Sequence, residues 1–319
     1  MKKIGKWVGI VLLVMGSVFV VLAFLPVIPL KSHPNIDPDR AAQLRAEQIN
    51  ENLSFVNSDG QTLFVRKWLP DSLIDEKKNT AILIFHGVTA HSGPYKMAGE
   101  PFAARGYATF GLDYRGHGLS DGHRGDYESR EVWKEDLSEG VRFIKSLGYD
   151  KVIVLGHSLG VAAAIYCYQK IPEEMDGLIL LSGGYRGREG VREKPDLLQK
   201  LHILSSSIIR PSYPVVHYFR EGMTGQDDPL FNFSYTLRFL TMVKKEELGF
   251  SPSMNIPVMV AVGDEDELFE VDAVREVFDD VPGDQKEFMV LKGAQHAHIP
   301  PGSWEEIGDW IDRNYTPND

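Results

Sequence analysis

A serine lies at the centre of a short, glycine-bounded turn between two segments of opposite character. Residues 156–160, Gly-His-Ser-Leu-Gly, follow the apolar run at residues 152–155 and open a helical pattern that continues to residue 170. A strand that is followed by a sharp turn and a helix holds Ser158 in a strained and exposed position, which suits a nucleophile. Glycine is needed on both sides because a side chain there would clash where strand and helix approach each other.

Short apolar segments alternate with amphipathic ones through most of the chain. Continuously apolar strands separated by helices are typical of a parallel sheet that is covered on both faces. We therefore expect an α/β fold with a mostly parallel, eight-stranded sheet, helices on both faces and an antiparallel hairpin at its start. The expected strands cover residues 53–57, 62–69, 81–85, 107–112, 152–155, 177–181, 258–262 and 287–291. The expected helices cover residues 95–105, 130–147, 159–170, 271–280 and 303–315.

Residues 184–255 interrupt this alternation. They contain no clear strand, and their most helix-like pieces cover residues 197–209 and 231–243, with proline-containing joints between them. Ligands bind at the carboxyl ends of the strands in such sheets, and an insertion of this length on that edge indicates a helical cap. The core of the fold is then expected over residues 53–183 and 256–319.

The N-terminal 30 residues differ in composition from the rest. Three lysines precede an uncharged segment at residues 7–30, whose 24 residues exceed the roughly 20 that cross a bilayer core. A cleaved secretory signal is the alternative, although its apolar core is usually only about 7–15 residues long. We predict a single-pass anchor at residues 1–30 and a polar stalk at residues 31–52. The lysines before the span favour a cytoplasmic N-terminus and an extracytoplasmic globular part.

The charge of the remaining chain restricts its partners. The formal net charge is -11, and the first 30 residues contribute only lysines, so the body is acidic. An acidic body without a basic stripe argues against a nucleic-acid partner. The single cysteine, Cys167, cannot form an internal disulfide and is expected to pack as a small apolar side chain. The sequence makes no prediction about the oligomeric state.

Two loops at the binding edge offer backbone amides close to the serine. His86-Gly87-Val88 follows the strand at residues 81–85, and its glycine lets the backbone fold under the nucleophile. The amides of Val88 and Leu159 are candidates for holding the oxyanion of a tetrahedral intermediate.

The loop at residues 113–122 is expected to be structural. Asp113 and Arg115 are predicted to pair and brace it, and its glycines permit tight turns. His117 and His123 lack a second pair of ligands at metal-binding spacing, so no metal site is predicted.

A serine hydroxyl needs a base within hydrogen-bond reach, and an imidazole base needs a carboxylate that fixes its tautomer. His296 follows the last expected strand and is the predicted base, with His298 as the alternative. Asp266 follows the penultimate strand and is the predicted acid, with Asp264 as the alternative.

These segments together resemble the α/β-hydrolase superfamily, and within it the monoacylglycerol lipase and lysophospholipase branch of serine aminopeptidase-like hydrolases. The order serine, acid, histidine along the chain is that of α/β-hydrolases. The motifs that carry the likeness lie at residues 86–95, 113–122, 156–160, 263–266 and 293–296, and the second is the most specific to this branch. The resemblance implies Ser158 as nucleophile, Asp266 and His296 as its partners, the amides of Val88 and Leu159 as oxyanion hole, and a cap over an apolar acyl pocket.

The expected function is ester hydrolysis at a membrane. We expect a membrane-tethered serine hydrolase that cleaves a lipid-like carboxylic ester, such as a monoacylglycerol or a lysophospholipid, through an acyl-enzyme on Ser158. No metal or organic cofactor is expected. An acyltransferase, or an esterase or amidase for small soluble substrates, would use the same residues. A non-catalytic membrane-tethered scaffold would predict damage at the three site positions, and none is visible.

Overall fold

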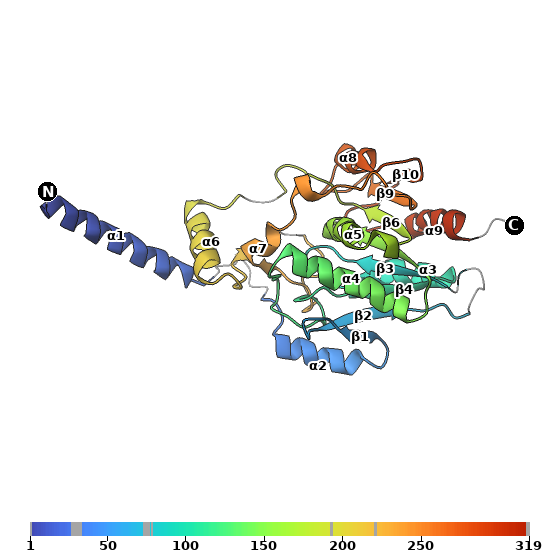
Figure 1. The fold of residues 1–319 in the computed structure, drawn as a ribbon, viewed down its shortest axis with the longest axis horizontal. Coiled ribbons are helices and arrows are strands. Elements are labelled where there is room, and N and C mark those ends of the chain that lie inside the picture. Colours follow the sequence, from blue (N-terminus) through green and yellow to red (C-terminus); the bar gives the residue numbers. More distant parts are fainter. Residues whose placement is uncertain are drawn as a thin grey trace.

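The computed structural model describes residues 2–26, 34–72, 77, 79–191, 194–219 and 222–316. Within these ranges a long helix, α1 (Lys2–Ala23), projects from an α/β body (Figure 1). The last helix, α9 (Pro301–Tyr315), lies on the opposite side of the body from the start of α1.

The body is built on an eight-stranded sheet with the order β1-β2-β4-β3-β5-β6-β9-β10. Strand β2 is antiparallel to both of its neighbours, and every other pair in this sheet is parallel. The expected mostly parallel sheet with an initial hairpin is therefore confirmed. Its strands are β1 (Leu53–Val56), β2 (Thr62–Trp68), β3 (Thr80–Phe85), β4 (Ala108–Leu112), β5 (Lys151–His157), β6 (Gly177–Leu181), β9 (Val258–Gly263) and β10 (Lys286–Leu291).

Helices cover both faces of the sheet, as the apolar strands predict. Alternate side chains of β3 enter two separate hydrophobic clusters, with Leu83 and Phe85 in one and Ile82 and Ile84 in the other. The first cluster is closed by α4 (Arg130–Ser146), α5 (Leu159–Lys170) and α8 (Val271–Asp280), and the second by α3 (Lys96–Ala104) and α9 (Pro301–Tyr315). Short 3₁₀ turns cover η1 (Gly93–Tyr95), η2 (Pro172–Glu174) and η3 (Lys245–Glu247).

The chain between α1 and the first strand packs on the body. Helix α2 (Pro38–Gln48) begins after Asp37, whose carboxylate accepts amide hydrogen bonds in the first turn. Arg45 pairs with Asp121 at 2.8 Å and donates to the Leu119 carbonyl at 2.7 Å. The part of the predicted stalk that the structure describes is thus fixed against the core; residues 31–33 lie outside the described residues.

The apolar N-terminal segment forms a helix that ends at Ala23, three residues before Pro26. Its stretch Gly5–Ala23 has 19 residues and a mean hydropathy of 2.3, which by length and composition is enough to cross a bilayer. Residues 27–30 of the predicted span lie outside the described residues.

The insertion between β6 and β9 differs in part from expectation. The helix predicted at residues 197–209 is confirmed as α6 (Leu197–Ile209), whereas the helix predicted over residues 231–243 is wrong. That segment forms β8 (Ser234–Tyr235) and the four-residue helix α7 (Leu237–Leu240). Strand β8 pairs with β7 (Val216–His217), so the expectation of no strand in the insertion is also wrong. Phe231, Phe233 and Tyr235 are all buried, and this two-residue spacing belongs to extended chain.

Candidate active site

The turn after β5 holds Ser158 in a strained conformation. Its φ of 58° and ψ of -117° lie in a region that side-chain-bearing residues rarely adopt. A Cβ atom at Gly156 would lie 2.1 Å from the Gly160 carbonyl oxygen, and one at Gly160 would lie 2.0 Å from the Phe85 carbonyl oxygen. Both glycines are therefore required by the close approach of strand and helix.

Three side chains from separate strand ends form a hydrogen-bonded row. His296 Nε2 lies 3.0 Å from Ser158 Oγ, and His296 Nδ1 lies 3.1 Å from Asp266 Oδ2. One tautomer satisfies both contacts, with Nδ1–H donating to the carboxylate and Nε2 accepting from the serine hydroxyl. The structure thus brings together the three residues predicted at the ends of β5, β9 and β10.

Asp266 is held as an ionised acceptor. Its side chain is buried, and its Oδ1 accepts hydrogen bonds from the amides of Leu268 and Phe269 at 2.8 and 2.9 Å. Burial acts to raise the pKa of this carboxyl, but the hydrogen bonds from His296 and the two amides outweigh it and hold the pKa below its usual value. The carboxylate is therefore charged at neutral pH and fixes the orientation of the imidazole.

The alternative acid and base take other positions. Asp264 is exposed, and its carboxylate accepts the amide of Gly293 at 2.6 Å. His298 is exposed. The neighbouring Glu267 carboxylate accepts the amide of His296 at 3.0 Å and so ties the two loops together.

The two predicted oxyanion amides flank the serine. A Cβ atom at Gly87 would lie 3.3 Å from Ser158 Cβ, so the loop after β3 lies directly against the nucleophile. Leu159 is the first residue of α5, where the amide has no partner within the helix. In the described part of the chain, neither the Val88 amide nor the Leu159 amide donates to a protein acceptor.

His86 fixes the loop that carries Val88. Its Nδ1 donates to the Gly87 carbonyl at 2.8 Å, and its Nε2 accepts the amide of Tyr114 at 3.2 Å. Burial lowers the pKa of His86 to about 4, so the ring is neutral and can accept and donate at once.

A second hydrogen-bonded chain connects the two sides of the site, and sequence reasoning assigned no role to it. The Gly87 amide donates to the Tyr95 hydroxyl at 2.9 Å, the hydroxyl donates to His157 Nδ1 at 2.7 Å, and His157 Nε2 donates to the His296 carbonyl at 2.9 Å. The pKa of His157 is lowered to about 3 by burial and by the nearby His296. The available signal was a histidine on a continuously apolar strand, because a buried polar ring requires partners.

The expected pairing of Asp113 with Arg115 is wrong. Asp113 accepts the amides of Ser92 and Leu119 at 2.6 and 2.8 Å. Arg115 pairs instead with Asp136 at 2.8 Å and with Asp59 at 2.7 Å. Both residues brace loops, as predicted, but through other partners. Among the described residues, no group of three or more His, Cys, Asp or Glu side chains could hold a metal ion.

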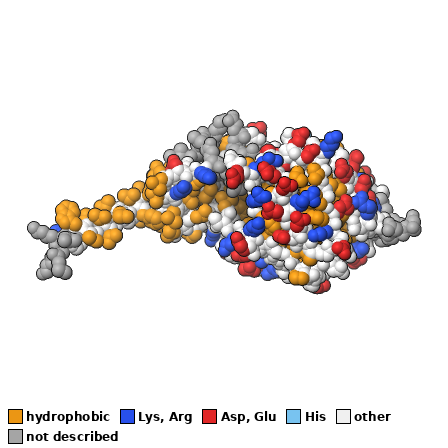
Figure 2. All heavy atoms as spheres, turned by 90° about the horizontal axis from the view of Figure 1, so that it is seen from above, with side chains coloured by type: hydrophobic (Ala, Val, Ile, Leu, Met, Phe, Trp, Pro, Cys, Tyr) orange, Lys and Arg blue, Asp and Glu red, His pale blue; other side chains and the backbone are white. Residues whose placement is uncertain are grey.

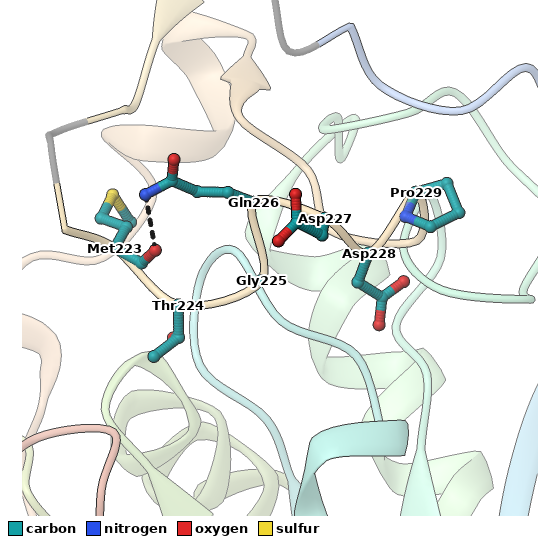
Figure 3. A pocket seen from close by; sticks show the side chains of 7 residues that line it. All are labelled: Met223, Thr224, Gly225, Gln226, Asp227, Asp228 and Pro229. Carbon is teal, nitrogen blue, oxygen red and sulfur yellow. Dashed lines mark hydrogen bonds between the residues drawn. The ribbon is translucent and has the colours of Figure 1, made fainter.

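A surface hollow of about 780 Å³ lies in the insertion, and none of the three site residues lines it (Figure 3). One rim connects to the core, because His91 Nε2 lies 3.0 Å from the Asp228 carboxylate. The hollow is open and polar, and we do not assign it to the site. It is lined by Met223, Thr224, Gly225, Gln226, Asp227, Asp228 and Pro229.

The sheet order, the strained serine between strand and helix, and the hydrogen-bonded row of three side chains define the class of protein as an α/β hydrolase. Residues 76–299 match the family model described as serine aminopeptidase, S33, and the chain belongs to this family.

Similarity to individual proteins agrees with this family assignment. The chain is similar to the monoglyceride lipase of Rattus norvegicus, with 24% identity over 279 residues that cover 80% of this chain and 88% of that protein. It is similar to the monoacylglycerol lipase of Mycolicibacterium smegmatis, with 25% identity over 76% of this chain and 89% of that protein. At the level of class, the protein is a serine hydrolase of carboxylic esters.

Solved structures share the fold at lower identity. The monoacylglycerol lipase of Paleococcus ferrophilus has a TM-score of 0.60 and 21% identity, covering 79% of this chain and 99% of that one. A soluble variant of the monoglyceride lipase of Saccharomyces cerevisiae, in complex with a substrate analog, has a TM-score of 0.63 and 17% identity, covering 84% and 96%.

Proposed function

We propose that the protein hydrolyses single-chain lipid esters, monoacylglycerols or lysophospholipids, through an acyl-enzyme on Ser158. The main support is the hydrogen-bonded row of Ser158, His296 and Asp266. His296 Nε2 lies 3.0 Å from Ser158 Oγ, and His296 Nδ1 lies 3.1 Å from Asp266 Oδ2. The lipid class is supported by relatives that are named monoglyceride and monoacylglycerol lipases and by the apolar helix α1.

The reaction proceeds in two halves. Ser158 Oγ attacks the ester carbonyl carbon while His296 Nε2 takes the hydroxyl proton, and the imidazolium then gives that proton to the departing alcohol. A water molecule next attacks the acyl carbon, His296 again accepts and returns a proton, and the free acid leaves Ser158 unchanged. Asp266 stabilises the imidazolium in both halves.

The oxyanion that forms in each half needs donors. The amides of Val88 and Leu159 flank Ser158 and are free of protein acceptors in the described part of the chain. The Leu159 amide also carries the positive end of the α5 dipole. One such donor typically contributes about 10²–10³ in rate.

We also propose that α1 is a single-pass anchor that holds the enzyme at a membrane. Its 19-residue apolar stretch supports this, because side chains that are exposed along a helix of this length need an apolar surrounding. Lys2 and Lys3 before the stretch, with Lys6 at its start, support a cytoplasmic N-terminus and an extracytoplasmic catalytic part.

The substrate class is tested with esters of graded chain length. The full chain in detergent is assayed on p-nitrophenyl esters from acetyl to dodecanoyl, and then on a monoacylglycerol, a lysophosphatidylcholine and a diacylglycerol, with free acid as the product measured. We expect kcat/KM to rise with chain length and the single-chain lipids to be cleaved faster than the diacylglycerol. Ser158→Ala is the matched control and should release no acid above background. A clear preference for the acetyl over the octanoyl ester would contradict the lipid assignment.

A further inference from the structure

Helix α6 carries an exposed apolar stripe. Its members recur at the spacing of one helix face, and three of them are 74%, 48% and 63% exposed, namely Leu197, Leu204 and Ile208. Leu198 and Leu201 are exposed beside them. The helix contains no acidic residue. A body of this size seldom leaves such a helix face in water.

The opposite face of α6 holds the end of α1. His202 and Ser206 are four residues apart and therefore share a face, and Arg210 follows directly after the last residue of α6. Ser206 Oγ donates to the Ala23 carbonyl at 3.1 Å, and Arg210 donates to the same carbonyl at 3.3 Å. His202 Nε2 donates to the Leu25 carbonyl at 3.0 Å. The last carbonyls of a helix have no partner within it, and here side chains of α6 and of Arg210 just after it supply the donors.

Side-chain packing reinforces this junction. Ala23 and Ser206 are buried, although α1 is otherwise almost wholly exposed. The Arg210 guanidinium also lies over the rings of Phe24 and Tyr213, at 5.2 and 3.5 Å from their centroids. Figure 1 shows α6 beside the end of α1, at the edge of the body that this helix meets.

The depth of α6 relative to the bilayer follows from the length of α1. A 19-residue helix rises about 28 Å at about 1.5 Å per residue, close to the roughly 30 Å of a bilayer core. If α1 spans the membrane, Ala23 lies where the hydrocarbon meets the headgroups, and α6, bonded to Ala23, lies at that same level. Figure 2 shows hydrophobic side chains covering α1 and continuing to the place where it meets the body.

We propose that α6 is a second membrane-contacting element, whose leucine stripe inserts into the acyl-chain boundary of the bilayer that α1 crosses, and that the bonds to Ala23 and Leu25 keep it there. The occupant of the stripe is the lipid bilayer, because the helix that carries the stripe is bonded to the end of α1, an apolar helix long enough to span one. The inference rests on the proposed anchor. It deepens the proposed function, because the insertion at residues 184–255 would contact the membrane that contains the lipid substrate.

The same insertion reaches the oxyanion loop. The Tyr235 hydroxyl donates to the Val88 carbonyl at 2.6 Å, and the Asn232 amide donates to the Thr89 carbonyl at 3.0 Å. One insertion therefore contacts the bilayer at α6 and the loop beside Ser158 at β8. Loss of membrane contact at α6 should accordingly affect substrates that are presented in a bilayer and spare soluble ones.

The insertion of the stripe is measured by lipid quenching. The full chain is reconstituted in phosphatidylcholine vesicles with a single fluorescent label on Leu204→Cys, and quenching by lipids with a nitroxide on the acyl chain is recorded. Cys167 is fully buried and stays unlabelled in the folded protein. Leu13→Cys in α1 is the positive control, and Ser146→Cys on the exposed end of α4 is the negative control.

We expect quenching at position 204 to approach that at position 13 and to exceed that at position 146 several-fold. Quenching at 204 no greater than at 146, with position 13 quenched, would overturn the inference while leaving the anchor intact. Disulfide crosslinking of two unlabelled Leu204→Cys chains on addition of an oxidant in dilute vesicles would likewise overturn it, because the stripe would then bind a second copy of the chain.

A double variant separates this inference from the proposed function. Leu201→Glu with Leu204→Glu changes exposed positions only, so the fold should persist. We expect hydrolysis of a vesicle-embedded monoacylglycerol to fall about tenfold and hydrolysis of soluble p-nitrophenyl butyrate to stay within twofold. Equal loss on both substrates, or no loss on either, would contradict the role of α6. Absence of hydrolysis in the unmodified chain would instead contradict the proposed function.

Discussion

The protons on His296 have one arrangement that satisfies both neighbours. Nδ1–H faces the Asp266 carboxylate and Nε2 faces the Ser158 hydroxyl, which leaves Nε2 free to act as a base. The Asp266 carboxylate is itself fixed by two amides, so the whole row is oriented before a substrate arrives.

At the residue scale we predict that Asp266→Asn lowers kcat by about 10³–10⁴ with little change in the fold, because an amide cannot fix the productive tautomer. The measurement is steady-state hydrolysis of p-nitrophenyl butyrate. Asp264→Asn is the matched control, since its side-chain oxygen can still accept the Gly293 amide, and its kcat should stay within threefold. Similar losses of kcat in the two variants would contradict the assignment of Asp266 as the partner of His296.

The identities of Ser158, Asp266 and His296 could be predicted because each follows an apolar strand and has a residue type that the chemistry needs. Side-chain direction could not be predicted. Asp113 and Arg115 are two residues apart, yet Asp113 binds the amide of Ser92 and Arg115 binds Asp136 in α4, and only the folded backbone determines this. The bonds of His157 to Tyr95 and to His296 likewise depend on ring orientation.

At the scale of elements, the approach of β5, β3 and α5 is the tightest constraint on the site. We predict that Gly160→Ala lowers the free energy of unfolding by about 2–3 kcal/mol, because its Cβ would lie 2.0 Å from the Phe85 carbonyl oxygen. Gly302→Ala, in the first turn of α9 with nothing within 4 Å, is the control and should be neutral or slightly stabilising. Urea unfolding compares the two. A stable Gly160→Ala enzyme would contradict the described elbow.

The loops beside the site also predict a pH dependence. His86 and His157 are buried, and burial lowers their pKa values to about 4 and about 3. Below pH 6.5 the unfolded chain binds protons at these two histidines while the folded chain does not, so stability falls as the pH decreases toward 4. We expect a loss of about 2 kcal/mol between pH 6 and pH 5. Urea midpoints across this range measure it, and a flat profile would contradict two buried neutral rings.

The core strands and the alternation of strands and helices along the chain could be predicted. The strands are buried on both faces of the sheet and are therefore continuous apolar runs in the sequence. The insertion was harder. Its helix α6 was predicted because an apolar segment bounded by Asp196 and Pro211 continues for several turns. The segment at residues 231–243 contains aromatic residues at every second position and then a single helical turn. Its conformation depends on contacts with the body, such as the hydrogen bond from the Asn232 side chain to the Gly116 carbonyl.

At the scale of the whole molecule, an acidic α/β body is joined to one long apolar helix. We predict that the full chain sediments with membranes and resists extraction by alkaline carbonate, because α1 exposes apolar side chains along about 28 Å. The intact mass should retain residues 1–30. Release into the carbonate supernatant, or a mass that lacks this segment, would favour the cleaved signal instead.

The most direct test of the account is covalent labelling of the nucleophile. The folded full chain is incubated with an alkyl fluorophosphonate, digested and mapped by mass spectrometry, with Ser158→Ala and Asp266→Asn in parallel. We predict one modified residue, Ser158, no label in Ser158→Ala, and labelling slowed by at least about tenfold in Asp266→Asn. A folded chain in which Ser158 stays unmodified, or in which Asp266→Asn reacts as fast as the unmodified chain, would contradict it.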